Sequence, residues 1–261
     1  MKRTGLAAAV TFIALGLAAP ASAGNLTVGA GSTLDLGAGS LALGCGDLDV
    51  SGTLTAGSVG FSAARDVAIA PGGIVNGNSA TLSLSGDWDN AGTFNAGAST
   101  VQMVDGCALF SGVVVGNTSF ANLAIITTTA KQVSFTAGSI QTVTGLLSLL
   151  GSAGNLLQIR STVNGSAAFL NAAGTSSASY VDVQDNNARP GKVIGLPANS
   201  VKGSNTPLWW FGTPVPLLAP MALGALALLL LASGQRWLPR STRSSRKGAA
   251  TTARQRRSGT S

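Results

Sequence analysis

The chain contains no histidine, and all nine of its acidic residues are aspartate, so glutamate is absent as well. Without histidine, the Ser-His-Asp and Cys-His arrangements for nucleophilic catalysis are excluded, and without glutamate the commonest carboxylate partner is missing. The chain has only two cysteines, so the usual ligands of a zinc site are also lacking. We therefore expect a non-enzymatic protein that needs no cofactor.

Positive charge is scarce in the central part of the chain. Between residues 24 and 212, nine Asp face six Lys and Arg, which gives this region a formal charge of −3, although the whole chain carries +7. The basic excess therefore belongs to the two ends. Because a nucleic-acid-binding domain needs a basic face on its folded surface, we expect no nucleic-acid partner.

The first 23 residues have the three-part pattern of a secretory signal peptide. Lys2 and Arg3 precede an apolar stretch over residues 6–19, and the small residues Ala21 and Ala23 stand just before Gly24. The pattern predicts export through the Sec translocon, cleavage by signal peptidase, and a mature chain that begins at Gly24.

A second apolar run, from Val215 to Ala232, is about long enough to cross a bilayer as a helix. Eight Lys and Arg and no acid follow it, and the positive-inside rule places such a tail in the cytoplasm. We expect a transmembrane helix over residues 213–235 and a basic cytoplasmic tail over 236–261. The chain would then be a single-pass inner-membrane protein with its body outside the cytoplasm. A buried core helix is the alternative.

This C-terminal segment resembles the IPTL-CTERM and PEP-CTERM class of bacterial sorting signals. The likeness rests on Val215, Pro216 and Leu218, then the apolar helix, then Arg236 and Arg240. The Pro-Glu-Pro triplet is absent, and the chain continues for 21 residues past Arg240. The resemblance implies an exosortase-type protease as a partner and transfer to the cell surface or extracellular matrix. A plain membrane anchor is the alternative.

The body of the chain, residues 24–212, alternates short apolar triplets with Gly, Ser, Asn and Asp. Each triplet places two apolar side chains on one side and a small or polar one on the other, as a short strand does, and the separating residues are turn formers. The triplets are Leu26–Val28, Leu34–Leu36, Leu41–Leu43, Leu48–Val50, Val59–Phe61, Val67–Ile69, Leu82–Leu84 and Val101–Met103.

Triplets that recur about every seven residues predict a parallel β-helix, or β-solenoid, with three strands in each coil of about 20 residues. Stacking such coils buries the inward apolar residues in one column. A β-sandwich is the alternative fold, but its strands are typically about five or six residues long. We therefore expect an all-β solenoid ectodomain.

Sequence segments in the later part of the body, from Gly86 onward, resemble those of bacterial secreted surface proteins built from right-handed β-strand repeats. The likeness rests on the Gly86-Asp87-Trp88 segment before a strand and on the Tyr-Val-Asp-Val segment at residues 180–183. It implies the solenoid architecture and secretion and transfers no catalytic residues. The segment Trp209–Phe211 is expected either to close the solenoid as its last strand or to form an aromatic belt at the membrane.

Cys45 and Cys107 form an even pair in a chain that is expected to be exported, where a disulfide persists. With coils of about 20 residues, the two cysteines would lie about three coils, or ~14 Å, apart, which exceeds the reach of a disulfide. A bond requires irregular coils or a turn that folds back over the stack. Two buried free thiols are the alternative.

Three aspartate pairs offer the best enzymatic hypothesis, because β-helix enzymes that cut acidic polysaccharides use Asp with Ca²⁺. The pairs are Asp47 with Asp49, Asp87 with Asp89, and Asp182 with Asp185. The residues from Asp87 to Asn90 and from Asp185 to Asn187 are instead typical of turns, where Asp and Asn bond their own backbone. Lys131, Arg160 and Lys192 are expected on solvated faces.

These features predict an anchored or sorted surface or matrix protein that acts in adhesion, surface coating or biofilm formation. The alternative is a membrane-anchored protein that binds or cleaves extracellular polysaccharide, with Ca²⁺ as its only expected ligand ion. No catalytic or metal-binding residue is assigned.

Overall fold

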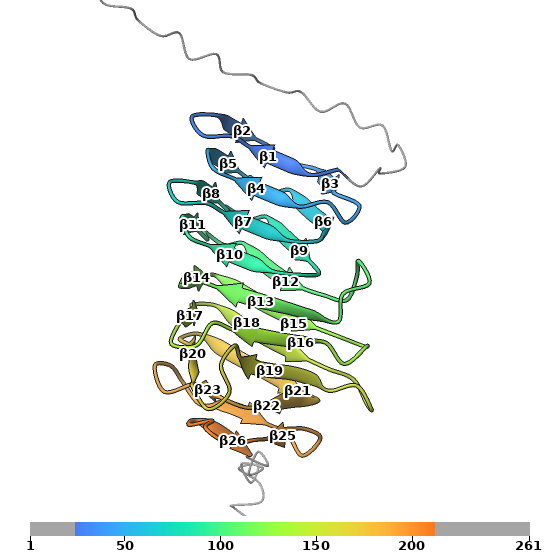
Figure 1. Ribbon diagram of the computed structural model, residues 1–261, viewed down its shortest axis with the longest axis vertical. Helices are drawn as coiled ribbons and strands as arrows, with labels where there is room; N and C mark the ends of the chain where they lie inside the picture. Colours follow the sequence, from blue (N-terminus) through green and yellow to red (C-terminus); the bar gives the residue numbers. More distant parts are fainter. Residues whose placement is uncertain (1–23, 212–261) are drawn as a thin grey trace, which may run out of the picture. The chain divides into compact units, whose positions relative to one another are not determined.

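The computed structural model describes residues 24–211, which form an all-β parallel solenoid of about eight turns (Figure 1). No helix able to cross a membrane is found among these residues. The expected signal peptide, transmembrane helix and basic tail lie outside the described residues. So do the predicted signal-cleavage residues Ala21 and Ala23.

The first face of the solenoid is a sheet of nine parallel strands, each contributed by a successive coil. Its strands are β1 (Leu26–Val28), β4 (Leu48–Val50), β7 (Val67–Ile69), β10 (Trp88–Asn90), β13 (Ser111–Val115), β16 (Gln132–Phe135), β19 (Leu157–Ser161), β22 (Val181–Val183) and β25 (Val201–Lys202).

The second face consists of two four-stranded parallel sheets, which meet between β11 and β14. The first contains β2 (Thr33–Asp35), β5 (Thr53–Thr55), β8 (Ile74–Asn76) and β11 (Thr93–Asn95), and the second contains β14 (Thr118–Phe120), β17 (Ile140–Val143), β20 (Ala168–Ala172) and β23 (Asn186–Asn187).

The third face is a seven-stranded parallel sheet, followed by a parallel pair of strands at the C-terminal end. The sheet contains β3 (Ser40–Ala42), β6 (Gly60–Ala64), β9 (Thr81–Leu84), β12 (Thr100–Met103), β15 (Asn122–Ile126), β18 (Leu146–Leu150) and β21 (Thr175–Ser179), and the pair is β24 (Ile194–Leu196) and β26 (Trp209–Phe211).

The short strands form because apolar residues alternate with small or polar ones. In β4 and β7 the two outer residues are buried and the middle one is partly exposed. The register aligns Leu48 with Val67, and Val67 with Trp88, so inward residues stack coil over coil. Burying this column supplies the main favourable free energy of the fold. The predicted β-solenoid is confirmed, and the alternative of a β-sandwich is not observed.

Coil length varies more than a 20-residue period suggests. Register pairs span 19 residues from Leu48 to Val67 but 26 from Trp88 to Val114. The longest connection, residues 104–110, lies where one coil passes from its third strand, β12, to the first strand of the next coil, β13. We call this edge of the solenoid the third corner.

The predicted turn from Asp87 to Asn90 is wrong, because residues 88–90 form strand β10. Trp88 is fully buried and packs against Phe94 and Phe120, with ring centroids 5.0 and 5.4 Å away. Its indole Nε1 donates to Oγ1 of Thr118 at 3.1 Å. Burial of this large ring fixes the inward direction of the strand, so Asp87 and Asp89 point outward.

At the C-terminal end, Trp209 is fully buried, and its Nε1 donates to Oδ1 of Asn186 at 3.2 Å. Its strand β26 pairs with β24, so residues 209–211 close the described solenoid. Trp210 and Phe211 are exposed.

Candidate functional site

The strongest concentration of charged groups lies on the outer edge of the first face. Asp47, Asp66 and Asp87 immediately precede β4, β7 and β10, and the register of these strands places the three residues in one column. Asp49 and Asp89 lie in a parallel column, with Ala68 between them in register. The structure therefore brings together two of the predicted Asp pairs, and adds Asp66, which the search for sequence-adjacent pairs missed.

Two carboxylates of the first column, those of Asp66 and Asp87, accept from backbone N–H groups one coil away. Oδ1 of Asp66 accepts from the N–H of Asp87 at 2.7 Å, and Oδ1 of Asp87 accepts from the N–H of Val113 at 2.7 Å. At the start of the column, Oδ1 of Asn25 accepts from the N–H of Asp47 at 3.0 Å. These side chains thus extend the hydrogen-bond ladder of the sheet.

Arg65 is the cation of this cluster. Its guanidinium contacts both oxygens of Asp47, at 2.9 and 2.6 Å, and Oδ2 of Asp66 at 3.0 Å. Hydrogen bonding and charge attraction from Asp47, and then the charge of Asp66, raise the pKa of Arg65 above its usual range. Because the Arg65 side chain is about half exposed, solvent weakens these ion pairs.

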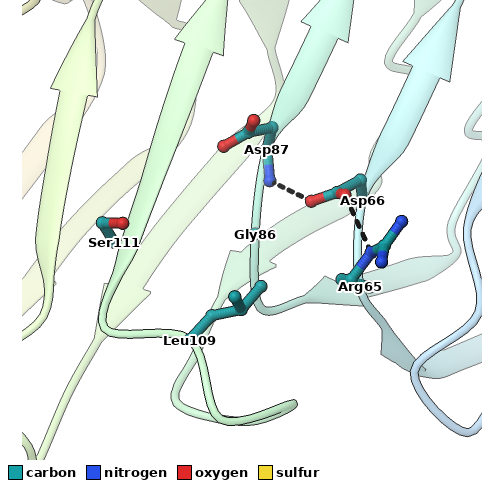
Figure 2. A pocket seen from close by; sticks show the side chains of 6 residues that line it. All are labelled: Arg65, Asp66, Gly86, Asp87, Leu109 and Ser111. Carbon is teal, nitrogen blue, oxygen red and sulfur yellow. Dashed lines mark hydrogen bonds and ion pairs between the residues drawn. The ribbon is translucent and has the colours of Figure 1, made fainter.

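Next to this network lies a shallow open pocket of about 280 Å³. Figure 2 shows Arg65, Asp66 and Asp87 along one side, with Leu109 and Ser111 on the other. Gly86 completes the lining. The carboxylates that face the pocket already accept backbone or guanidinium hydrogen bonds. The arrangement therefore suits stabilisation of the stack more than proton transfer.

The third predicted pair, Asp182 and Asp185, is not brought together as one site. Asp182 forms an ion pair with Arg160, whose Nη2 lies 2.5 Å from Oδ2. Asp185 is buried and accepts from the N–H of Gly165 at 2.9 Å. That bond is the largest cause of a lowered Asp185 pKa, and side-chain donors from Asn205 and Gln184 add to it. Within residues 24–211 no cluster of His, Cys, Asp or Glu could hold a metal ion.

Cys45 and Cys107 are joined by a disulfide, with Cα atoms 5.5 Å apart. Both residues lie at the third corner, Cys45 before β4 and Cys107 before β13. The bond is geometrically allowed because residues 104–110, which we call the corner hairpin, fold back over the stack. Gly106 and Leu109 form an antiparallel bridge, and Cys107 and Ala108 at the tip have positive φ. In Figure 1 the hairpin is the green loop that projects beside β12.

The base of the corner hairpin is held by Asp105. Its Oδ1 accepts from Oγ1 of Thr127 at 2.7 Å, and its Oδ2 accepts from the N–H of Thr128 at 2.6 Å. Burial raises the pKa of Asp105, but hydrogen bonds from Thr127, Thr128 and Thr129 outweigh it, so the pKa lies below its usual 3.8.

Lys131 is fully buried, which contradicts the prediction of a solvated side chain. Its ammonium donates to the carbonyl oxygens of Ser85 and of Leu109, the latter at 3.3 Å. Burial lowers its pKa below the usual 10.5, although the charges of Asp105 and Asp87 oppose this effect. Arg160 was also predicted on a solvated face, but its side chain is mostly buried in the ion pair with Asp182. Lys192 is exposed as expected and donates to the carbonyl of Gly174 at 3.0 Å.

The predicted sorting residues Val215, Pro216, Leu218, Arg236 and Arg240 lie outside the described residues. Gly24, the predicted first residue of the mature chain, is the first described residue, and its N–H donates to the carbonyl of Leu43 at 3.3 Å. Comparisons with family models, with curated proteins and with solved structures find no match to this chain.

Proposed function

We propose that this chain is a non-enzymatic, exported surface or matrix protein that acts in adhesion, surface coating or biofilm formation. The observation that carries the proposal is the disulfide between Cys45 and Cys107 at the corner of a parallel solenoid. Disulfides persist in oxidising compartments outside the cytoplasm. The signal-peptide pattern of residues 1–23 is an independent sign of export.

The chemistry of the acidic cluster also supports a structural role. Asp66 and Asp87 each accept a hydrogen bond from a backbone N–H of the next coil, and Asp47 forms an ion pair with Arg65. A general acid or base must reach a substrate proton. Side chains already engaged in holding adjacent coils together are poorly suited to that task.

We further propose that residues 213–235 anchor the chain or serve as an exosortase-class sorting signal. The test is the intact mass of the mature protein from membrane, cell-surface and culture fractions. Sorting predicts a surface or culture species that ends near Val215. A plain anchor predicts only a species that extends from Gly24 to Ser261 in the membrane fraction, and a species that retains Met1 would contradict export by this signal.

The adhesive role is tested by deletion of the chain and restoration of it in the native host. Attachment to surfaces and biofilm mass should fall on deletion and return when the wild-type chain is restored. Restoration with a chain that lacks residues 1–23 is the matched control and should fail. Unchanged attachment in the deletion strain would overturn this role.

The second candidate function is binding or cleavage of extracellular polysaccharide. It is favoured by the open pocket beside Arg65, Asp66 and Asp87. The test is incubation of the purified chain with acidic polysaccharides, with and without Ca²⁺. Turnover that requires Ca²⁺ and is lost in Asp87→Asn but retained in Asp182→Asn would favour the enzyme. Binding without turnover would favour an adhesin whose ligand is a saccharide.

A further inference from the structure

Charge is divided sharply along the solenoid. All nine aspartates lie between residues 35 and 185, where Arg65, Lys131 and Arg160 oppose them. From residue 186 to 211 the chain contains Arg189, Lys192 and Lys202 and no acid. All three of these cations are exposed. The C-terminal coil is therefore a basic end on an otherwise acidic body.

The same coil carries most of the exposed large apolar side chains. Of nine such residues among those that the structure describes, five lie between residues 193 and 211. These five are Val193, Val201, Leu208, Trp210 and Phe211, with exposed fractions of 52, 48, 39, 65 and 45%. They lie in or next to β24, β25 and β26, at the end of the stack opposite β1 (Figure 1).

The register explains why the two aromatic side chains remain exposed. Trp210 aligns with Gly195 and Phe211 with the buried Leu196. Phe211 therefore adds to the column of inward side chains next to Leu196, at the end of the stack. Trp210 lies beside Gly195, which has no side chain to cover it. Trp210 and Phe211 point to opposite sides of β26, and each leaves apolar area exposed at the end of the stack that a binding partner would cover.

The sequence that follows indicates the partner. Only the three residues 212–214 separate Phe211 from Val215, where the apolar run to Ala232 begins, so the two are four chain steps apart. A fully extended chain of that length spans at most about 14 Å. The polar headgroup region on each side of a bilayer is about 5–8 Å thick. If the run enters the hydrocarbon at Val215, the aromatic end of the solenoid is held at or close to the headgroups.

We propose that the C-terminal coil docks on an anionic lipid surface, with Trp210 and Phe211 inserted among the headgroups and Arg189 and Lys202 facing the lipid phosphates. Trp is favoured at membrane interfaces, and Lys and Arg near the surface are attracted to anionic lipids. The acidic coils would then point away from the membrane. This inference rests on the membrane anchoring proposed above.

The test uses the mature full chain in nanodiscs that contain equal parts of zwitterionic and anionic phospholipid, brominated near the headgroup. Trp237→Phe removes the tryptophan that follows the apolar run and leaves Trp88, Trp209 and Trp210. Because Trp88 and Trp209 are fully buried, bromine should quench the share of emission that comes from Trp210. Adding Trp210→Phe should abolish this quenching. Arg189→Gln with Lys202→Gln should weaken it.

The alternatives give different results. Equal emission in brominated and unbrominated nanodiscs, with the chain still bound to them, would overturn docking but leave anchoring intact. Recovery of the chain free of nanodiscs would overturn both. Shielding of Trp210 from aqueous iodide in detergent, together with sedimentation as a multimer, would assign the surface to a second copy and overturn docking on lipid.

Discussion

Single polar side chains hold the third corner together by bonding to groups in other coils. Asp105 reaches Thr127 and Thr128, and Lys131 reaches the carbonyls of Ser85 and Leu109. Leu109 belongs to the corner hairpin, so Lys131 and Asp105 both fix its base. A buried ammonium is costly unless it donates hydrogen bonds, and here two backbone oxygens accept from it.

Replacing Lys131 by methionine should change how stability depends on pH. Because burial lowers the pKa of Lys131 in the folded protein, the unfolded chain binds more protons between that lowered pKa and 10.5. The free energy of unfolding of the wild type therefore rises with pH in this window. The free energy of unfolding of Lys131→Met should not show this rise. Urea unfolding of both proteins at increasing pH should show the difference moving in favour of the wild type.

A difference between wild type and Lys131→Met that stays constant as the pH rises toward 10.5 would show that the ammonium is not desolvated. Lys202→Met is the matched control, because it removes an exposed cation from the same protein.

Asp105→Asn should destabilise the protein by about 1–3 kcal/mol at neutral pH, since a charged acceptor of several hydrogen bonds is lost. The stabilisation from Asp105 is fully present above pH 3.8, and it is lost as the pH falls through the lowered pKa of the folded state. Chemical unfolding at neutral and acidic pH measures both effects. The exposed Asp89→Asn is the control, and an equal loss in the two variants would refute the role of Asp105.

Lys131 is predicted to lie in solvent because most lysines are exposed. Its burial follows from the corner hairpin, which brings the carbonyl of Leu109 over it. Nothing in the residues around position 131 encodes that long-range arrangement. The same holds for Asp66, which belongs to the acidic column only because the coils place it in register with Asp47 and Asp87.

At the scale of the strand, the fold depends on inward side chains that stack in register. Phe120 of β14 is buried between Trp88 and Phe94, with ring centroids 5.4 and 6.0 Å away. These aromatic rings fill the interior where the second face passes from one sheet to the next. Among the described residues, the second face is interrupted once, between β11 and β14, and the aromatic cluster packs the interior at that interruption.

Phe120→Ala should cost about 3–5 kcal/mol, the usual loss for a buried Phe. Phe110→Ala makes the same chemical change at a side chain that is 66% exposed, and it should cost less than about 0.5 kcal/mol. Denaturant unfolding monitored by tryptophan emission compares the two. Similar losses in both variants would mean that the aromatic cluster is not part of the core.

Close stacking of coils also restricts which residues can form the turns. Gly57 and Gly72 both have positive φ, at 64° and 83°. A Cβ at Gly57 would overlap the carbonyl oxygen of Gly37 in the preceding coil, whereas a Cβ at Gly72 would meet nothing within 4 Å.

Gly72→Ala should therefore cost only the backbone strain, about 1–2 kcal/mol. Gly57→Ala should cost clearly more, because the clash adds to that strain. Thermal unfolding of the two variants measures the contrast. Equal losses would show that the coils can separate to admit a methyl group.

The sequence predicted the strands with two inward apolar residues well, since β4 and β7 coincide with the triplets Leu48–Val50 and Val67–Ile69. The strands of the second face were harder to find. In β5 and β8 only the central residue, Leu54 or Val75, is buried, and both of its neighbours are partly exposed. A single inward residue leaves no periodic signal.

At the scale of the whole molecule, the corner hairpin and its disulfide join parts of the chain 62 residues apart. A cross-link of that span is expected to stabilise the fold by about 4 kcal/mol through the unfolded state. Regular coil spacing alone puts the two cysteines too far apart, and the sequence allows a bond only through irregular coils or a turn that folds back over the stack. The corner hairpin is such a turn, but the strand period does not encode where a seven-residue insertion folds back.

We propose that the chain is an exported solenoid held together by this disulfide. The most direct test is mass spectrometry of the protein from the native cell envelope, after alkylation of free thiols without reduction. We expect a chain that begins at Gly24, carries no alkyl group and yields a linked peptide pair containing Cys45 and Cys107. A chain that retains Met1 and carries alkyl groups on both cysteines would contradict it.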